Sequence, residues 1–278
     1  MSEQHFIDTD FGRIAISDSD PGGSGACLFL IHGNSSLKEV FATTIEAFRD
    51  RIRVVAMDLP GHGASADAED PPAVYTIPHY AEAARAVIAK MGLDPVCVFG
   101  WSLGGHIGLE MVAQGATLAG LAICGTPPVA LSGPDKGRGF IPSPELSLAG
   151  KRDFSEADCE AYGAATVGGA EHLTQVLRDG VRRTDGLARE TMFNAILSGD
   201  LADEKQLVES NATPLAILDG EEDVFIDHDY LAHGIVYANI WGGGRQAIPG
   251  AGHAPFLTHP AAFNPLLDGF LTAVMPPR

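Results

Sequence analysis

The sequence is poor in cysteine, in basic residues and in long apolar runs, and each shortage excludes a class of protein. Four cysteines among 278 residues, with no Cys-x-x-Cys pair, do not make a disulfide framework or a zinc ribbon. Lysine and arginine number 18 against 36 aspartates and glutamates, so the formal charge of −18 argues against binding to nucleic acid or to an anionic membrane surface. No apolar run approaches the ~20 residues of a membrane-spanning helix.

The amino-terminal residues lack the basic start and the apolar stretch of a secretory signal peptide. Cys27, Cys97 and Cys124 lie inside short apolar runs, where buried free thiols are the expected state. We therefore expect a soluble protein of the reducing cytoplasm. The chain is 45% hydrophobic and 19% charged, which is typical of a globular protein, and its length suits one large domain that carries an insertion.

Short apolar runs alternate with amphipathic stretches along much of the chain. This alternation predicts an α/β fold, with a mostly parallel sheet and helices on both of its faces. After an opening β-hairpin around residues 10–12, the predicted strands lie at 27–31, 53–57, 96–99, 118–124, 214–218, and 239–241 with 245–248. The predicted helices of this part lie at 38–48, 79–91, 103–114 and 260–274.

The alternation of strands and helices stops between residues 127 and 211. A stretch rich in glycine and proline reaches about Pro144, and four helical segments follow without a strand, at about 155–166, 170–182, 186–197 and 200–209. We therefore predict an α/β core made of residues 1–126 and 212–278, with an inserted helical cap at 127–211. An insertion over the carboxyl ends of the strands is the place for a lid above an active site.

The strongest chemical signal is the pentapeptide at 100–104, Gly-Trp-Ser-Leu-Gly, between a predicted strand and a predicted helix. This is the context that a Gly-x-Ser-x-Gly nucleophile turn requires. Ser102 must occupy a strained strand-to-helix turn, so neighbours without a Cβ are needed on both sides. The helix start also offers backbone N–H groups to a developing negative charge. We predict Ser102 as the nucleophile.

A nucleophilic serine needs a base, and the sequence offers ten histidines. His253 lies in a turn between the last predicted strand and the last predicted helix, and residues that disfavour helix flank it. His32 and His62 lie in glycine turns and are expected to shape their loops, while His106 is expected to pack on its helix. We predict His253 as the base.

The third member of such a triad is an acid, in the chain order serine, acid, histidine. Asp223 is our prediction, because it follows strand 214–218 at a point where the loop can turn back towards His253. Glu222 remains the alternative. The other usual position for the acid, after the strand that ends at Cys124, holds no carboxylate. The acid would hold the imidazole tautomer and stabilise the imidazolium as it forms.

An oxyanion hole for the same reaction needs two N–H donors. Leu103, the residue after the nucleophile, should supply one of them. The turn after the first buried strand, at 32–35, should supply the other, from the N–H of Asn34. Loss of one such donor typically raises the barrier by about 3–4 kcal/mol.

These residues, in this order, resemble the α/β-hydrolase fold over nearly the whole chain. The segments HGNSS (32–36), DLPGHG (58–63), GWSLGGHIGLEM (100–111), GTPPVA (125–130) and AGHAPF (251–256) look like the metal-independent N-acyl-homoserine lactonases of that fold. Those enzymes open the lactone ring of bacterial quorum-sensing signals. The resemblance implies that Tyr162 and Asn34 contact the lactone end of the substrate, that no cofactor is needed, and that the divergent stretch 131–150 lines the acyl pocket.

The residues alone support a broader set of interpretations. Tyr162 fits a structural tyrosine of an amphipathic helix, Asn34 fits a turn residue, and Trp101 either packs under the site or lines it as a substrate-binding residue. The hypothesis is hydrolysis of N-acyl-homoserine lactones by a Ser-His-Asp triad through an acyl-enzyme, without a metal because the chain has no H-x-H-x-D-H cluster. A general carboxylesterase, a carbon–carbon bond hydrolase and a non-catalytic ligand receptor remain as alternatives. The partner is then a small acyl lactone or ester, while acyl length and oligomeric state stay open.

Overall fold

The computed structural model describes residues 3–23 and 25–275, and a mostly parallel sheet lies at their centre. The strands follow the order β1-β2-β4-β3-β5-β6-β7-β8. β1 and β2 form an antiparallel hairpin at one edge, β2 pairs antiparallel with β4, and the remaining neighbours pair in parallel. The strands are β1 (Glu3–Thr9), β2 (Gly12–Asp18), β3 (Cys27–Ile31), β4 (Arg53–Met57), β5 (Val96–Trp101), β6 (Gly120–Cys124), β7 (Leu215–Gly220) and β8 (Gln246–Ile248).

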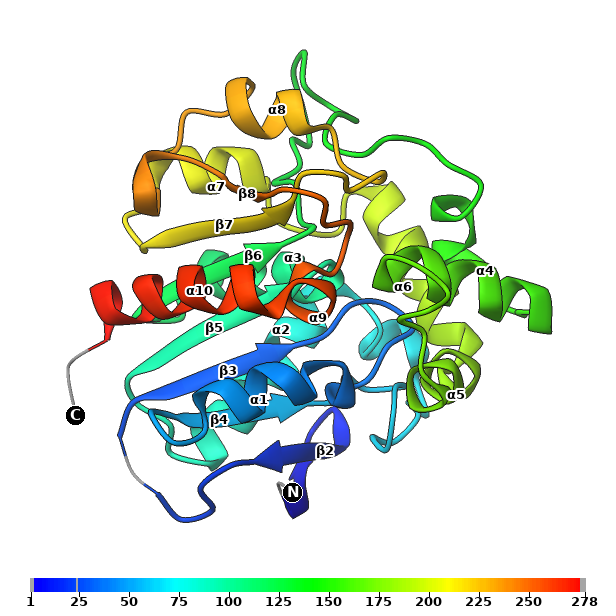
Figure 1. Cartoon of the computed structure of the whole chain (residues 1–278). Coiled ribbons are helices and arrows are strands. Elements are labelled where there is room, and N and C mark those ends of the chain that lie inside the picture. The colour runs from blue at the N-terminus through cyan, green and yellow to red at the C-terminus, as the bar shows by residue number, and fades with distance from the viewer. Residues whose placement is uncertain (1–2, 24, 276–278) are drawn as a thin grey trace.

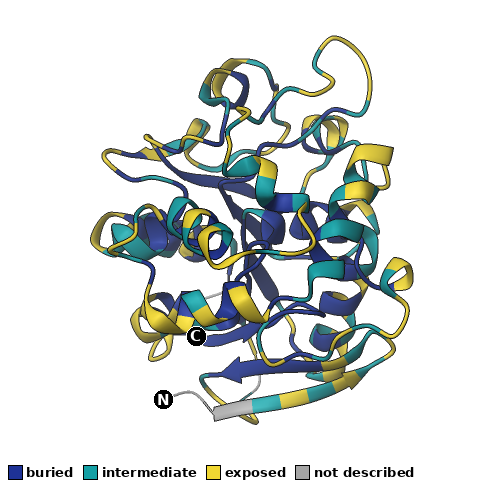
Figure 2. Ribbon diagram, turned by 90° about the vertical axis from the view of Figure 1, so that its right-hand side faces the viewer, coloured by how far each residue is buried: buried dark blue, intermediate teal, exposed yellow. Residues whose placement is uncertain are grey.

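Helices cover both faces of this sheet, which confirms the predicted α/β architecture (Figure 1). α1 (Ala42–Phe48) and α10 (Pro260–Val274) pack on one face, and α2 (Ile77–Lys90) and α3 (Leu103–Ala113) pack on the other. Every residue of β3, β4, β5, β6 and β7 is buried, because a covered parallel sheet has no face left for water. Figure 2 shows the buried strands at the centre and the exposed residues on the outer surfaces.

Residues 127–211 lie between β6 and β7 and carry helices from residue 146 onwards, and we call them the helical segment. It contains a short 3-10 helix at Leu146–Gly150, then α4 (Glu156–Val167), α5 (Gln175–Arg183), α6 (Gly186–Ser198) and α7 (Glu204–Ser210). α4, α5 and α6 gather beyond the carboxyl ends of the parallel strands, whereas α7 packs against α3 (Figure 1). Ser155 starts α4 with a capping box, and Gly168 ends it in the left-handed conformation with φ of 84°.

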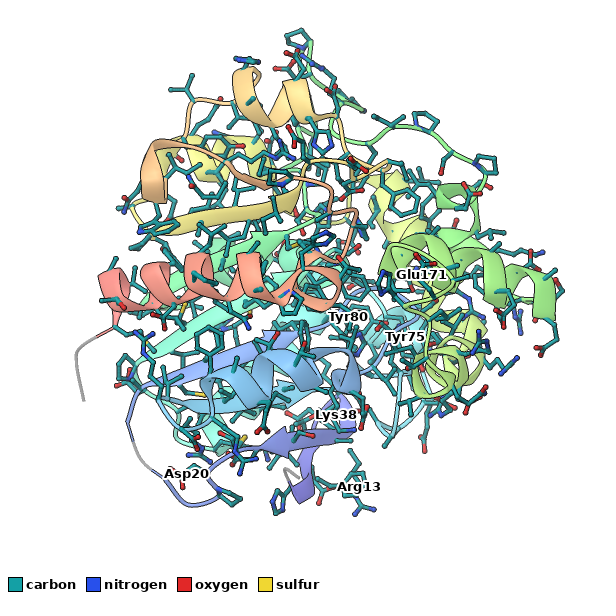
Figure 3. All side chains as sticks on the ribbon, viewed as in Figure 1. Arg13, Asp20, Lys38, Tyr75, Tyr80 and Glu171 are labelled. Carbon is teal, nitrogen blue, oxygen red and sulfur yellow. The ribbon has the colours of Figure 1, made fainter. Side chains whose placement is uncertain are left out.

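Polar contacts fasten the helical segment to the loop that follows β4. The hydroxyl of Tyr75 donates to Asp185 Oδ2 at 2.8 Å, and the N–H of Asp185 donates to the carbonyl of Gly61 at 2.9 Å. Tyr75 lies beside Tyr80, with 6.2 Å between the ring centroids, where the core meets the helical segment (Figure 3). The turn between α5 and α6 is therefore anchored on the core.

The predicted elements differ from the observed ones mainly where they are short. α8 (His228–His233) and α9 (Pro255–Thr258) span too few turns to produce a periodic apolar pattern, so the sequence does not predict them. The predicted strand at 239–241 is reduced to a single bridge between Ile240 and Leu215, and β8 provides the edge strand. The predicted helix at 38–48 begins as a 3-10 turn at Lys38–Phe41 before α1.

All four cysteines are buried free thiols, as the apolar surroundings of three of them predict. Burial raises the pKa of the Cys27 thiol to about 12, so this side chain stays protonated at neutral pH. Within residues 3–23 and 25–275, no helix has both the length and the hydropathy needed to cross a bilayer.

Candidate active site

Ser102 stands on a strained turn between β5 and α3. It is the residue before the first turn of α3, and its φ of 54° and ψ of −119° lie where side chains are rarely found. The N–H of Ser102 donates to the carbonyl of Cys124 at 2.7 Å, and the hydroxyl of Thr126 donates to the carbonyl of Ser102 at 2.8 Å. These bonds to the end of β6 hold the turn in its strained shape.

The two glycines of the pentapeptide are required by space. A Cβ on Gly104 would lie 2.0 Å from the carbonyl oxygen of Ile31, and a Cβ on Gly100 would lie 2.2 Å from the carbonyl oxygen of Gly104. The strand, the turn and the helix can pack this closely because both flanking positions lack a side chain. The strand, turn and helix predicted around Ser102 are thus present, and the role of Ser102 as nucleophile stays a prediction.

His253 and Asp223 meet at the carboxyl edge of the sheet. Nδ1 of His253 lies 2.7 Å from Oδ2 of Asp223, and both side chains are buried. The N–H of Phe225 donates to the other oxygen of Asp223 at 3.0 Å. Burial would raise the pKa of Asp223, but the adjacent imidazole and the Phe225 N–H outweigh it, so this pKa lies below its ordinary value. An ionised carboxylate therefore faces the ring nitrogen of His253 at neutral pH.

The structure separates the two candidate acids and places Trp101 against His253. Glu222 is exposed and its carboxylate does not contact His253, so Asp223 is the carboxylate that reaches the imidazole. The indole N–H of Trp101 donates to the backbone carbonyl of His253 at 2.8 Å, and Trp101 is 1% exposed. Trp101 therefore packs under the site and supports His253. A direct contact of Trp101 with substrate stays a prediction.

Asp219 is a buried carboxylate that the sequence prediction does not include. Its Oδ1 accepts the N–H of Gly125 at 2.7 Å, and Nε of Arg245 lies 3.2 Å from its Oδ2. A Cβ on Gly125 would lie 2.5 Å from Cε1 of His253, so Asp219 holds the loop against which the imidazole rests. Burial raises the pKa of Asp219 to about 6. Its place at the carboxyl end of β7 is the signal that could have identified it.

The two predicted oxyanion donors come from elements that lie against Ser102. Leu103 is the first residue of α3, and the N–H groups of a first helical turn have no partner within the helix. Asn34 follows β3, and the residue before it, Gly33, lies so close that a Cβ there would be 3.1 Å from Cβ of Ser102. The structure therefore brings the turn that carries Asn34 next to Ser102.

Asn34 also joins the core to the helical segment. Its Nδ2 donates to the carbonyl of Ala149 at 2.9 Å and to the hydroxyl oxygen of Tyr162 at 3.2 Å. Both side chains are buried, with 7% of Asn34 and 5% of Tyr162 exposed. The two residues that the family resemblance implies for the lactone end thus lie together, although 128 positions separate them in the sequence.

The remaining histidines near the site behave as the sequence predicts. Nδ1 of His32 lies 2.7 Å from the carbonyl of Gly33, and Nε2 of His32 accepts the N–H of Leu59 at 3.0 Å. Nδ1 of His62 lies 3.0 Å from the carbonyl of Pro60, and the His62 ring is tilted by 56° against that of His32, with 5.3 Å between their centroids. Both rings therefore shape the loops after β3 and β4. Among the described residues, no three His, Cys, Asp or Glu side chains gather in a way that could hold a metal ion.

Acid is expected to unfold the protein through these two buried rings. Burial lowers the pKa of His32 to about 4 and that of His62 to about 3, whereas both imidazoles titrate near 6.5 when unfolded. The unfolded chain therefore binds more protons below pH 6.5, and each ring lowers the free energy of unfolding by about 1.4 kcal/mol per pH unit down to pH 4. The pKa of Asp219 is about 6 in the folded protein and 3.8 when unfolded, so between these two pH values its protonation stabilises the fold and cancels the effect of one histidine ring.

Urea unfolding at pH 7, 6 and 5 measures this dependence. A stability that stays constant between pH 6.5 and 5 would contradict the assignment of neutral buried rings.

Comparison with known proteins agrees with the α/β fold. Residues 28–266 match the family model described as "Alpha/beta hydrolase family". The solved structure of the N-acyl homoserine lactonase AidH complexed with N-butanoyl homoserine is 41% identical, with a TM-score of 0.92 over 98% of this chain and 97% of that chain. A variant of AidH complexed with N-hexanoyl homoserine lactone is 40% identical, also with a TM-score of 0.92, over 98% of both chains. The pimeloyl-[acyl-carrier protein] methyl ester esterase of Xanthomonas axonopodis pv. citri is 29% identical over 264 residues, which cover 91% of this chain and 97% of that protein.

Proposed function

The chain belongs to the alpha/beta hydrolase family, and we propose that it hydrolyses the lactone ring of N-acyl-homoserine lactones with Ser102, His253 and Asp223 as its triad. The observation that carries this proposal is the 2.7 Å contact between His253 Nδ1 and Asp223 Oδ2, next to the strained turn of Ser102. The 41% identity to AidH over 98% of the chain supports a lactone as the substrate.

The first half of the proposed reaction forms an acyl-enzyme. Nε2 of His253 takes the proton of Ser102 as the serine oxygen attacks the lactone carbonyl carbon. The N–H groups of Leu103 and Asn34 stabilise the oxygen anion of the tetrahedral intermediate. His253 then gives the proton to the ring oxygen, the ring C–O bond breaks, and the new alcohol stays attached to the acyl group.

In the second half of the reaction, water must attack the acyl-enzyme before the tethered alcohol closes the ring again. The tethered alcohol sits at a high effective concentration beside the ester, so it competes with water for the acyl-enzyme. Water, activated by His253, attacks the ester carbon and releases Ser102 together with an N-acyl-homoserine carboxylate. A donor that binds the tethered alcohol would slow ring closure, and Tyr162 of the helical segment is suited to this role. We assign residues 127–211 as the cap that lies over the substrate.

A carboxylesterase acting on open esters is the second candidate. The methyl ester esterase from Xanthomonas, which matches over 264 residues, favours it. The same triad would serve this reaction, because an open ester and a lactone pass through the same type of acyl-enzyme. With an open ester the alcohol leaves the enzyme when the acyl-enzyme forms, whereas with a lactone it stays attached to the acyl group.

Ring opening by the purified protein tests the proposal. We expect turnover of short-chain and long-chain N-acyl-homoserine lactones, followed by proton release and by a product heavier by one water. Activity should persist in EDTA, since the proposed chemistry uses no metal. Cleavage of aryl esters without ring opening would make the carboxylesterase the better assignment. Slow labelling of Ser102 without product release would instead favour a ligand receptor.

A further inference from the structure

Arg189 of α6 is a buried cation whose hydrogen bonds go to neutral oxygens. Its side chain is 3% exposed, and its guanidinium lies 4.0 Å from the centre of the Phe154 ring. It donates to the carbonyls of Lys151 and Arg152, each at 2.9 Å, and to that of Thr184 at 3.3 Å. Among the residues that the structure describes, no carboxylate pairs with it. Burying a charge without a counter-ion costs free energy, so a buried arginine of this kind calls for an explanation beyond packing.

The remaining bond of Arg189 crosses from the helical segment to the core. Nη1 donates to the hydroxyl oxygen of Ser35 at 3.4 Å. Ser35 has a φ of 54°, and within the described residues it shares a positive φ with no other non-glycine residue except Ser102. The hydroxyl of Ser35 in turn donates to Oδ1 of Asn34 at 3.3 Å. Arg189 therefore stands at the start of a chain of donors that leads to the oxyanion turn.

The side-chain amide of Asn34 links this chain of hydrogen bonds to Tyr162. The carbonyl of Ala149 can only accept, so Nδ2 must be the atom that faces it. Its second hydrogen then goes to the hydroxyl oxygen of Tyr162. Because Tyr162 accepts this bond, its own hydroxyl proton is left to donate to another group. Both hydrogens of the Asn34 amide are thereby used within the protein, and Tyr162 is the donor that remains.

We propose that Arg189 is a positioning residue for ring opening: through Ser35 and Asn34 it orients the Tyr162 hydroxyl as a hydrogen-bond donor towards the substrate. The inference rests on the function proposed above and adds a residue that touches neither Ser102 nor the lactone. Arg189 can only donate hydrogen bonds, so its positive charge favours the arrangement in which Ser35 donates to Asn34 and Asn34 donates to Tyr162. Its bonds to the carbonyls of Lys151 and Arg152 also tie α6 to the chain that leads into α4, the helix that carries Tyr162.

A double-mutant cycle on Arg189→Gln and Tyr162→Phe tests this proposal. If Arg189 acts through Tyr162, each single variant should lose at least tenfold in kcat for lactones, and the double variant should be no more than about twofold worse than the poorer single. The ratio of lactone to aryl-ester turnover should fall in both single variants. If Arg189 mattered only for folding, its replacement would lower the turnover of both substrates equally, and the loss would be the same with or without Tyr162.

Matched variants keep the test independent of stability. Arg182→Gln, which removes a 2.6 Å ion pair with Glu156 on the same helical segment, should change kcat less than twofold. If Arg189→Gln does not accumulate as folded protein, Ser35→Ala enters the cycle with Tyr162→Phe, because it breaks the same chain at its next link. Losses that multiply in the double variant would overturn the proposal.

The outcome also separates this proposal from the proposed function. A wild-type protein that cleaves aryl esters but opens no lactone would refute the lactonase assignment and, with it, a positioning role in ring opening. A wild-type protein that opens lactones, but whose losses multiply in the double variant, would overturn the positioning role alone.

Discussion

Replacing Ser102 with alanine should abolish catalysis while leaving the fold intact. We expect kcat for ring opening to fall by about four orders of magnitude or more, because the nucleophile and its base act as one unit. The oxyanion donors and the substrate pocket would remain, so the variant should still bind substrate. Ring opening followed by product mass, together with lactone binding measured by calorimetry, checks both halves of this expectation.

A fluorophosphonate probe provides the complementary measurement. The wild-type protein should gain one probe adduct on the peptide that contains Ser102, and Ser102→Ala should gain none. Ser210 is a matched control, because it is exposed on α7 and its replacement by alanine should preserve both labelling and turnover. Ring opening that survives in Ser102→Ala would show that another group attacks the lactone.

Replacing Asp223 with asparagine should produce the second large loss. An asparagine can occupy the same volume, but it cannot stabilise the imidazolium and it favours the wrong tautomer of His253, so kcat should fall by about 10⁴-fold. The pKa of Asp223 lies below its ordinary value, so the native carboxylate is charged throughout the range in which activity would be assayed. Single-turnover kinetics with an aryl ester would show that both acylation and deacylation are slowed.

The neighbouring carboxylate supplies the control for this prediction. Glu222 is exposed and lies one residue away, so Glu222→Gln should retain activity within about twofold. If Glu222→Gln lost activity and Asp223→Asn kept it, the acid of the triad would have to be reassigned. The 2.7 Å contact of Asp223 with His253 is the reason that we expect the opposite result.

Much of the core was predictable because its constraints are local. The glycines at 100 and 104, the buried strand before them and the helix after them are fixed by contacts within a few residues, apart from the contact of Gly104 with β3. The four helices of residues 127–211 were predictable in number, because each starts after a residue whose side chain caps it, although α5 and α7 begin at Gln175 and Glu204 rather than at the predicted 170 and 200.

The contacts between distant segments could not be read from the same patterns. The bond of Asp219 to Gly125 spans 94 positions, and that of Arg189 to Ser35 spans 154. Such pairs depend on how the helical segment docks and on which side chain faces inward after docking. Trp101 shows that this holds even within the pentapeptide. Its indole donates to the backbone carbonyl of His253 and packs against Phe256, and both residues lie far away in the sequence.

The order of the strands has a consequence for the chain as it is synthesised. From β3, the sheet extends outwards through β5, β6, β7 and β8, and each of these strands pairs with a strand that precedes it in the sequence. The segments that contact the turn of Ser102, namely β3, β5 and β6, are all translated before the loops that carry Asp223 and His253. Ribosome-bound intermediates would hold a serine without its base, so ester-cleaving activity should first appear after residue 253 has left the exit tunnel.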